Sequence, residues 1–322
     1  MILITGGLGF IGANTAQALL DSGESCVLVQ RRVATLPSTW ADNVRERAVI
    51  EQVDITDLDK FLEIGRRHRI TGIVHLAGST PWPPGSTDPV GSARSAVDSL
   101  LNVVQAAREW DVTRVSVAST IGVYAGVDAS NPLREDLPLT MTAGHVIPAF
   151  KKIGELLTDH LTDAAGVPIV NLRLAAIWGP LGRPTSVFFP APQLIHAAAR
   201  GNALDLSTVS AHLHTDNGID LCYVKDCAAA IARLQLATRL NYRTYNIGSG
   251  RVTTIGDLVA AINAVAPGCP VDLRDGRDPC GPDHDSYLDI TRLQQDTGYR
   301  PAYDTERAVA DYVDWLRAGN ER

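Results

Sequence analysis

The chain has 322 residues, of which 45% are apolar and 20% charged, so it can bury a large core. Its 29 basic and 36 acidic side chains give a net charge of −7. Because there is no basic stripe to neutralise phosphates, we expect no nucleic-acid partner. No apolar run approaches the roughly 18 residues needed to cross a bilayer, so we expect no membrane partner either.

Cysteine and histidine patterns point away from disulfides and metals. The five cysteines are odd in number and contain no C-x-x-C, which indicates reduced thiols in a cytoplasmic protein. The apolar I-L-I-T follows Met1 directly, so we expect no cleavable leader. His212 and His214 alternate on one expected strand, but no third ligand has suitable spacing, and we expect no metal site.

Short apolar runs alternate with helical patterns along the first half of the chain. The runs lie at 2–5, 26–30, 48–50, 72–76, 114–118 and 169–174. Strands that are apolar on both faces and separated by helices are typical of a parallel, doubly wound sheet. We therefore predict an α/β fold of the Rossmann type, with ligands bound at the edge where the strands end.

This rhythm breaks near residue 175. Prolines and glycines crowd residues 180–192, and the segments after 250 are shorter and less regular. We predict a dinucleotide-binding domain at 1–174 that is joined by 219–249. A smaller C-terminal substrate lobe is predicted from 175–218 and 250–322.

A glycine-rich turn, T-G-G-L-G-F-I-G, spans residues 5–12 between the first strand and the first helix. Glycine lets the backbone turn tightly and approach a pyrophosphate, and the N-terminus of the helix offers free N–H groups to the anion. The turn predicts a dinucleotide site made by five residues, namely Gly6, Gly9, Phe10, Ile11 and Gly12.

The end of the second strand indicates which dinucleotide binds. An NAD site usually places Asp or Glu there to hold the ribose hydroxyls, whereas this chain has Gln30, Arg31 and Arg32. Two guanidiniums can clamp a 2′-phosphate, so we predict NADP(H); the alternative is that both arginines only solvate a loop. Asp54 is expected to meet the adenine edge. Other cofactor contacts are expected after the third and fourth strands, at Ile55, Leu76, Ala77 and Gly78.

Ordered motifs along nearly the whole chain resemble the extended short-chain dehydrogenase/reductases, a group with nucleotide-sugar epimerases and dehydratases. They are the glycine turn, H-L-A-G at 75–78, S-T-I-G-V-Y at 119–124, R-L-A-A-I-W-G-P at 173–180, Y-V-K-D at 223–226, Y-N-I-G-S-G at 245–250 and T-G-Y-R-P at 297–301. The resemblance implies a catalytic Ser or Thr, and a Tyr four residues before a Lys.

The catalytic tyrosine implied by the family is missing. Thr120 fills the Ser/Thr position, with Ser119 beside it in support, and both are predicted as catalytic. Lys151 is predicted as the lysine, because it lies four residues before Glu155, and it would also orient the nicotinamide ribose. Four residues before Lys151 stands Ile147, and none of the eight tyrosines is followed by lysine at plus four.

Three hypotheses remain for the activity, and reduction of a ketone is preferred. Hydride addition needs help at the developing alkoxide, which Thr120, Lys151 or a phenol on the substrate can supply. The I-x-x-x-K pattern and the paired arginines also resemble atypical angucyclinone ketoreductases. This resemblance implies an NADPH-dependent ketoreductase of a polycyclic aromatic polyketide in antibiotic biosynthesis.

The second hypothesis is a sugar-nucleotide epimerase or dehydratase. Its chemistry begins by taking a proton from an alcohol, the step that most needs the missing tyrosine. The family's Asn before G-P is also replaced, by Ala176. In the third hypothesis catalysis is lost and the chain is an NADP(H)-binding sensor.

Aromatic residues near the ligand edge predict a substrate wall. Flat rings suit a polycyclic ligand, although core packing is an equal alternative for each of them. His145 could act as a substitute acid or lie at a helix start. The predicted substrate contacts are Trp82, Thr120, His145, Ile147, Trp178 and Phe188. We expect a small-molecule aromatic substrate and a monomer or homodimer.

Overall fold

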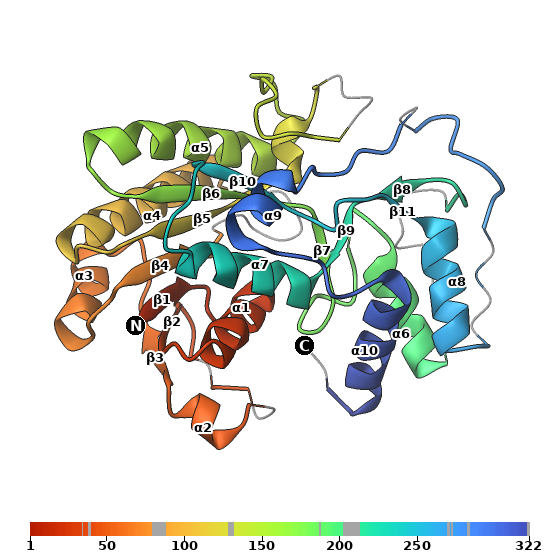
Figure 1. Cartoon of the computed structure of the whole chain (residues 1–322), viewed down its shortest axis with the longest axis horizontal. Helices are drawn as coiled ribbons and strands as arrows, with labels where there is room; N and C mark the ends of the chain where they lie inside the picture. Colours follow the sequence, from red (N-terminus) through yellow and green to blue (C-terminus); the bar gives the residue numbers. More distant parts are fainter. Residues whose placement is uncertain are drawn as a thin grey trace.

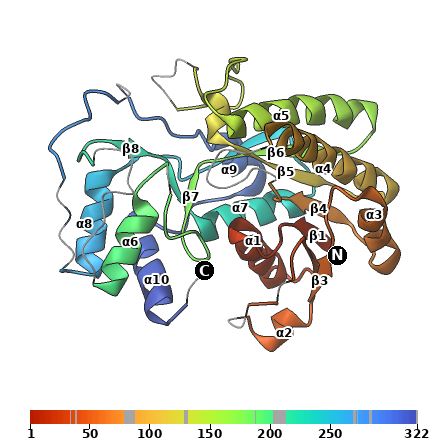
Figure 2. The same ribbon diagram turned by 180° about the vertical axis from the view of Figure 1, so that it is seen from behind.

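The structure is a computed structural model that describes residues 1–33, 35–37, 40–78, 88–127, 132–186, 188–201, 213–268, 271, 273–281 and 284–320. A central parallel sheet with helices on both faces lies beside a lobe of three helices (Figures 1 and 2). The predicted α/β Rossmann-type fold is confirmed.

The central sheet has seven strands, all parallel, in the order β10-β6-β5-β4-β1-β2-β3. Ile2 lies opposite both Cys26 and Gly72, so β1 is central between β2 and β4. The strands are β1 (Ile2–Thr5), β2 (Cys26–Gln30), β3 (Ala48–Gln52), β4 (Gly72–His75), β5 (Val115–Thr120), β6 (Ile169–Leu174) and β10 (Thr244–Ile247).

Two hydrophobic cores enclose this sheet, because successive side chains of a strand point to opposite faces. In β1, Leu3 packs into the core shared with α3 and α4, whereas Ile4 packs into the core shared with α1 and α7. Figure 1 shows α3, α4 and α5 on one face and α1 and α7 on the other. These helices are α1 (Phe10–Asp21), α3 (Leu58–Arg67), α4 (Pro89–Glu109), α5 (Val146–Ala164) and α7 (Val224–Leu236). Short helices lie at α2 (Asp42–Arg45) and η1 (Ile121–Tyr124), the latter a 3₁₀ turn directly after β5.

The second lobe has its own core, formed mainly by three helices. They are α6 (Ala191–Arg200), α8 (Ile255–Val265) and α10 (Thr305–Arg317). Two small sheets complete it: β7 (Ala176–Trp178) pairs with β9 (Leu221–Tyr223), and β8 (Gly218–Ile219) pairs with β11 (Thr253–Thr254).

The boundary between the lobes is more interleaved than a simple division suggests. Helix α9 (Thr291–Thr297) falls in the range predicted for the substrate lobe, yet its Leu293 and the nearby Tyr299 lie in the core of the Rossmann sheet. The residue ranges assigned to the two lobes stay a prediction.

Four of the five cysteines lie among the described residues. Cys26, Cys222, Cys227 and Cys280 are free thiols, and Cys269 lies outside the described residues. Across the described ranges, no helix is both long and apolar enough to cross a membrane.

Candidate active site

The glycine turn after β1 has the geometry of a phosphate cradle. Gly6 has φ +66°, a left-handed conformation that favours glycine, and a Cβ on Gly12 would overlap the Gly6 carbonyl. Gly9 begins α1 without a side-chain cap, and the first turn of α1 carries no acidic residue. The N-terminal N–H groups of Phe10 and Ile11 are therefore free of a competing carboxylate, so the turn fits a dinucleotide pyrophosphate.

The residues that end β2 lie against this turn. With its amide oxygen toward the turn, Gln30 accepts hydrogen bonds from Gly7 N at 3.0 Å and from Leu8 N. Arg31 and Arg32 are exposed, and neither takes part in an ion pair with the described residues. Both guanidiniums are thus available to an anion beside the glycine turn.

The loop after β4 is held at the same sheet edge. Leu76 N and Ala77 N donate to Thr5 Oγ1 at 3.2 and 3.1 Å, and Ala77 Cα is 3.2 Å from the place of a Cβ on Gly6. Leu76 and Ala77 therefore pack against the glycine turn. Among the described residues, no atom lies within 4 Å of the place of a Cβ on Gly78.

Asp54 and Ile55 follow β3 at the same edge. Asp54 Oδ1 accepts from Thr56 N at 3.0 Å and from Thr56 Oγ1 at 2.8 Å. The carbonyl of Ile55 accepts from Asn102 of α4 at 2.9 Å. These bonds fix the loop, and the predicted adenine contacts of Asp54 and Ile55 stay predictions.

A cavity of about 50 Å³ lies between the ends of β4, β5 and β6 and the helices α4 and α5. Lys151 lines it and donates from Nζ to the Ala118 carbonyl at 2.6 Å. Burial lowers the pKa of Lys151 to about 8, although the Glu155 carboxylate opposes that shift. The amine therefore exchanges protons near neutral pH, as a general acid or base must. The lining of the cavity includes His75, Gly78, Ser119, Ile147, Phe150 and Asn171.

His75 is a neutral hydrogen-bond donor in this cavity. Thr5 Oγ1 already accepts two backbone N–H groups, so its own hydrogen goes to His75 Nδ1 at 2.8 Å. The remaining ring nitrogen, Nε2, then carries the proton. Burial, together with the nearby charge of Lys151, lowers the pKa of His75 to about 3.

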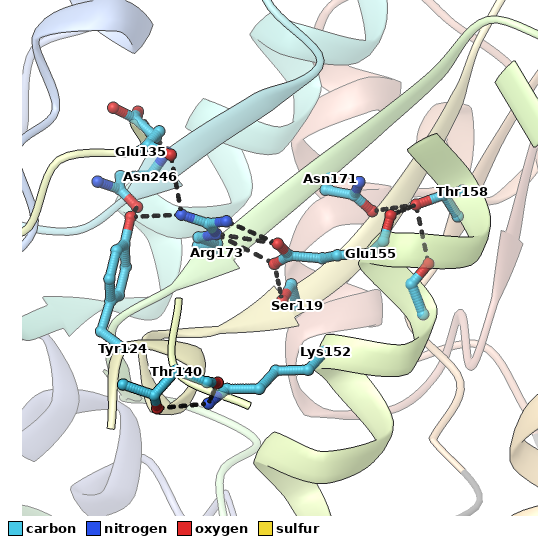
Figure 3. Close-up of polar contacts among 11 residues, drawn as sticks. Ser119, Tyr124, Glu135, Thr140, Lys152, Glu155, Thr158, Asn171, Arg173 and Asn246 are labelled. Atoms are coloured by element: carbon cyan, nitrogen blue, oxygen red, sulfur yellow. Dashed lines mark hydrogen bonds and ion pairs between the residues drawn. The ribbon is translucent and has the colours of Figure 1, made fainter. Parts of the chain in front are cut away.

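A buried polar network supports the site from behind (Figure 3). Ser119 Oγ donates to Glu155 at 2.5 Å, and Glu155 forms an ion pair with Arg173 at 2.7 Å. Arg173 also donates to Tyr124 at 2.8 Å, and Tyr124 donates to Asn246 at 2.9 Å. The network joins β5, α5, β6, η1 and β10, so Ser119 is held by Glu155 in a supporting position.

Ile147 stands at the position where the family has its tyrosine, and Thr120 stands at the family's Ser/Thr position. Thr120 begins η1, and its Oγ1 accepts from Gly122 N at 3.2 Å, which leaves the hydroxyl hydrogen for another acceptor. Ile147 lines the cavity one helical turn before Lys151. The place of the tyrosine is therefore occupied by an apolar wall.

The predicted substrate wall is only partly brought together. The rings of His145 and Phe188 stack with centroids 5.6 Å apart, and Phe188 is 48% exposed. Trp178 is 2% exposed and packs on Tyr223 and Tyr312, so its contacts are those of core packing in the second lobe. Trp82 lies outside the described residues.

His145 has a structural role at the start of α5. It is the N-cap residue, and its Nδ1 accepts from Ile147 N at 3.4 Å. This is the helix-start alternative weighed for it in the sequence. His214 is buried, His212 lies outside the described residues, and the described part of the chain has no group of three metal-ligating side chains.

Sequence reasoning missed two polar groups of the site. His75 and Arg173 both stand inside the family-like motifs H-L-A-G and R-L-A-A-I-W-G-P, which is the signal that could have found them. What the motifs could not give is the partner of each: His75 bonds to Thr5, and Arg173 to Glu155.

The fold and the site together define an enzyme of the Rossmann oxidoreductase class. A sequence profile of the NAD dependent epimerase/dehydratase family matches residues 2–248, and the chain belongs to this family. The family resemblance inferred from the motifs is thereby confirmed.

Several similar proteins are named as sugar-nucleotide enzymes. UDP-glucose 4-epimerase of Azospirillum brasilense is 26% identical over 98% of this chain and 92% of its own. UDP-glucuronate 4-epimerase of Thermodesulfobacterium geofontis is 27% identical over 77% and 75%. The solved UDP-N-acetylglucosamine 4-epimerase of Methanobrevibacter ruminantium has a TM-score of 0.81 at 23% identity, over 99% of this chain and 98% of its own.

These comparisons correct the preferred functional hypothesis. The prediction of a ketoreductase of an aromatic polyketide in antibiotic biosynthesis is wrong, because several relatives are named as UDP-sugar 4-epimerases and one similar structure as a dTDP-glucose 4,6-dehydratase. The related resemblance to angucyclinone ketoreductases has no support among them. A nicotinamide dinucleotide cofactor agrees with the family description, which names NAD. The choice of NADP(H) stays a prediction. The monomeric or homodimeric state and the cytoplasmic location stay predictions.

Proposed function

We propose that this chain transfers a hydride between a nicotinamide dinucleotide and a carbinol carbon of a sugar nucleotide. The observation that carries the proposal is the position of Lys151, whose buried amine shares one cavity with Gly78 of the loop that packs against the glycine turn. A proton-exchanging group thus lies next to the edge where a dinucleotide fits. The relatives named for UDP-sugars support the substrate class.

NADP(H) is the proposed cofactor. Gln30 carries no charge, so it leaves the 2′-position of the ribose without the carboxylate that would repel a phosphate. Arg31 and Arg32 are exposed beside it, with no carboxylate partner in the described residues. The similar epimerase structures of Thermus thermophilus and Bifidobacterium longum are complexes with NAD and NAD⁺, so NADP(H) is a point on which we propose that this chain differs from them.

Lys151 supplies the proton chemistry in place of the missing tyrosine. A dinucleotide bound on the glycine turn would take up or supply the hydride. When the substrate alcohol is oxidised, its O–H bond breaks and the proton passes to the unprotonated Nζ of Lys151, while the C–H electron pair leaves as hydride. Reduction returns both to the carbonyl. The Thr120 hydroxyl donates to the substrate oxygen in both directions.

A second candidate is an NADP(H)-binding protein without catalysis. The observation that favours it is Ile147, which puts an apolar side chain at the position of the family's proton-transferring group. Binding and turnover separate the two candidates.

The test is incubation of the purified chain with NADP⁺ and a panel of UDP-glucose, UDP-glucuronate and dTDP-glucose. We expect at least one sugar nucleotide to be converted, with products identified by chromatography and mass spectrometry. Tight binding of NADPH together with no conversion of any member would overturn the enzymatic proposal and favour the binding protein. Tighter binding of NADH than of NADPH would overturn the cofactor assignment.

A further inference from the structure

Lys152, the residue after Lys151, is buried and faces away from the cavity. It is 8% exposed, and its Nζ donates to the Thr140 carbonyl at 2.6 Å and to Thr140 Oγ1 at 3.3 Å (Figure 3). It also donates to the Thr142 carbonyl at 2.6 Å. Within the described ranges, no carboxylate lies at ion-pair distance from it. A buried ammonium must satisfy its three N–H groups, and here one short segment satisfies them all.

That segment, residues 138–145, is also tied to the end of the 3₁₀ turn η1. Thr140 Oγ1 donates to the Ala125 carbonyl at 2.8 Å. Gly126 has φ +83°, and a Cβ there would be 3.1 Å from Thr140 Oγ1, so the loop at Gly126 and the 138–145 segment approach closely. Lys152 on one side and Ala125 on the other therefore fix the middle of the 138–145 segment.

The far end of the same segment leads into the helix that lines the cavity. It ends at His145, which caps α5 through Ile147 N and stacks on Phe188 of the second lobe. Ile147 itself lines the cavity with Lys151. The 138–145 segment therefore caps the helix that carries Ile147 and also contacts Phe188 of the second lobe.

We propose that Lys152 is a positioning residue that holds the 138–145 segment and, through it, the start of α5 beside the active site. The inference rests on the proposed function in one respect, namely that the substrate binds beside Lys151. Lys152 does not touch the reacting atoms; it acts through Thr140, Thr142 and the His145 end of the segment.

Lys152→Met tests this role, because it removes the ammonium and keeps the chain length. The control is Lys60→Met, since Lys60 is exposed on α3, does not line the cavity, and pairs with Asp57 at 2.7 Å among the described residues. We expect KM for UDP-glucose to rise about tenfold in Lys152→Met, with kcat and NADPH affinity within about twofold of the wild type. Lys152→Arg, which keeps donors at this position, is expected to restore part of the loss. An unchanged KM, or equal losses in kcat and NADPH affinity, would overturn the positioning role.

A second measurement does not depend on turnover. Hydrogen exchange of the amides in 138–147 is expected to accelerate about tenfold in Lys152→Met, to accelerate less in Thr140→Val, and to stay unchanged in Lys60→Met. Thr140→Val keeps both backbone acceptors, so it serves if Lys152→Met does not fold. If the wild type converts no sugar nucleotide of the panel, the proposed function fails, and the role of Lys152 in holding the 138–145 segment is then judged by hydrogen exchange alone. Unchanged hydrogen exchange of these amides in both Lys152→Met and Thr140→Val would contradict the positioning role of Lys152.

Discussion

Two consecutive lysines on α5 have opposite surroundings. Neighbouring residues of a helix point about 100° apart, so Lys151 faces the cavity and Lys152 faces the 138–145 segment. Lys151 spends one N–H on the Ala118 carbonyl, whereas all three donors of Lys152 are used by Thr140 and Thr142. Only Lys151 is therefore placed to exchange a proton with a ligand.

Removing the amine of Lys151 is expected to abolish most of the turnover. General acid–base catalysis contributes roughly 100- to 10,000-fold, so Lys151→Met is expected to lower kcat at least about 100-fold in steady-state assays. Lys60→Met is the matched control and is expected to leave kcat unchanged. A Lys151→Met variant that is folded and keeps wild-type turnover would show that the proton comes from elsewhere.

The pH dependence of oxidation follows from the pKa of Lys151, which burial lowers to about 8. Oxidation needs the unprotonated amine, of which only about one tenth is present at pH 7. The rate of alcohol oxidation is therefore expected to rise with pH up to about 8 and then level off, while reduction shows the opposite trend. Profiles of kcat/KM in both directions check this, and a rising limb that survives in Lys151→Met contradicts it.

The arginines after β2 are expected to select the phosphorylated dinucleotide. Arg31→Ala and Arg32→Ala should each weaken NADPH binding about tenfold, or ~1.4 kcal/mol, and leave NADH binding within about twofold. Calorimetry measures both affinities, with Arg66→Ala on the surface of α3 as the control. Equal losses for NADPH and NADH would remove the 2′-phosphate contact.

At the scale of elements, one buried ion pair joins α5 to β6. Arg173 and Glu155 are 6% and 10% exposed, and the pair also holds Ser119 and Tyr124. Removing one partner leaves the other charge buried and unpaired. Arg173→Met is therefore expected to lower the free energy of unfolding by about 3–5 kcal/mol in urea titration.

The exposed pair between Arg243 and Asp163 is the control for that experiment. Arg243→Met is expected to leave the free energy of unfolding close to that of the wild type, because water screens the exposed pair. Similar losses in the two variants would mean that the α5–β6 pair has no special role in the fold.

Elements were predictable where one local rule decides them. Strands such as Ile2–Thr5 are apolar on both faces, and the glycine turn that follows has a fixed spacing, so the sheet and the cofactor edge follow from the sequence. The interleaving of α9 with the Rossmann core was not predictable, because it depends on contacts of Leu293 that span the whole chain. The hydrogen bonds between Lys152 and Thr140 were not predictable either, because no periodic pattern in the sequence indicates them.

At the scale of the whole molecule, fold does not determine the substrate. Aromatic residues favoured a flat ligand in the sequence, yet Trp178 packs in the core of the second lobe while Phe188 is half exposed and stacks on His145. Composition cannot distinguish these two environments. Because Ile147 stands in place of the tyrosine, the sequence favoured ketone reduction. The names of the relatives indicate sugar nucleotides instead.

The central claim is that Lys151 replaces the tyrosine in hydride chemistry on a sugar nucleotide. The most direct test is a single turnover of the chain with NADP⁺ and UDP-glucose, followed by the absorbance of the reduced nicotinamide. We predict a transient that forms in the wild type, accelerates as pH rises to about 8, and is lost in Lys151→Met. A transient that is equally fast in Lys151→Met, or no transient in a wild type with NADP⁺ and UDP-glucose both bound, would contradict the account.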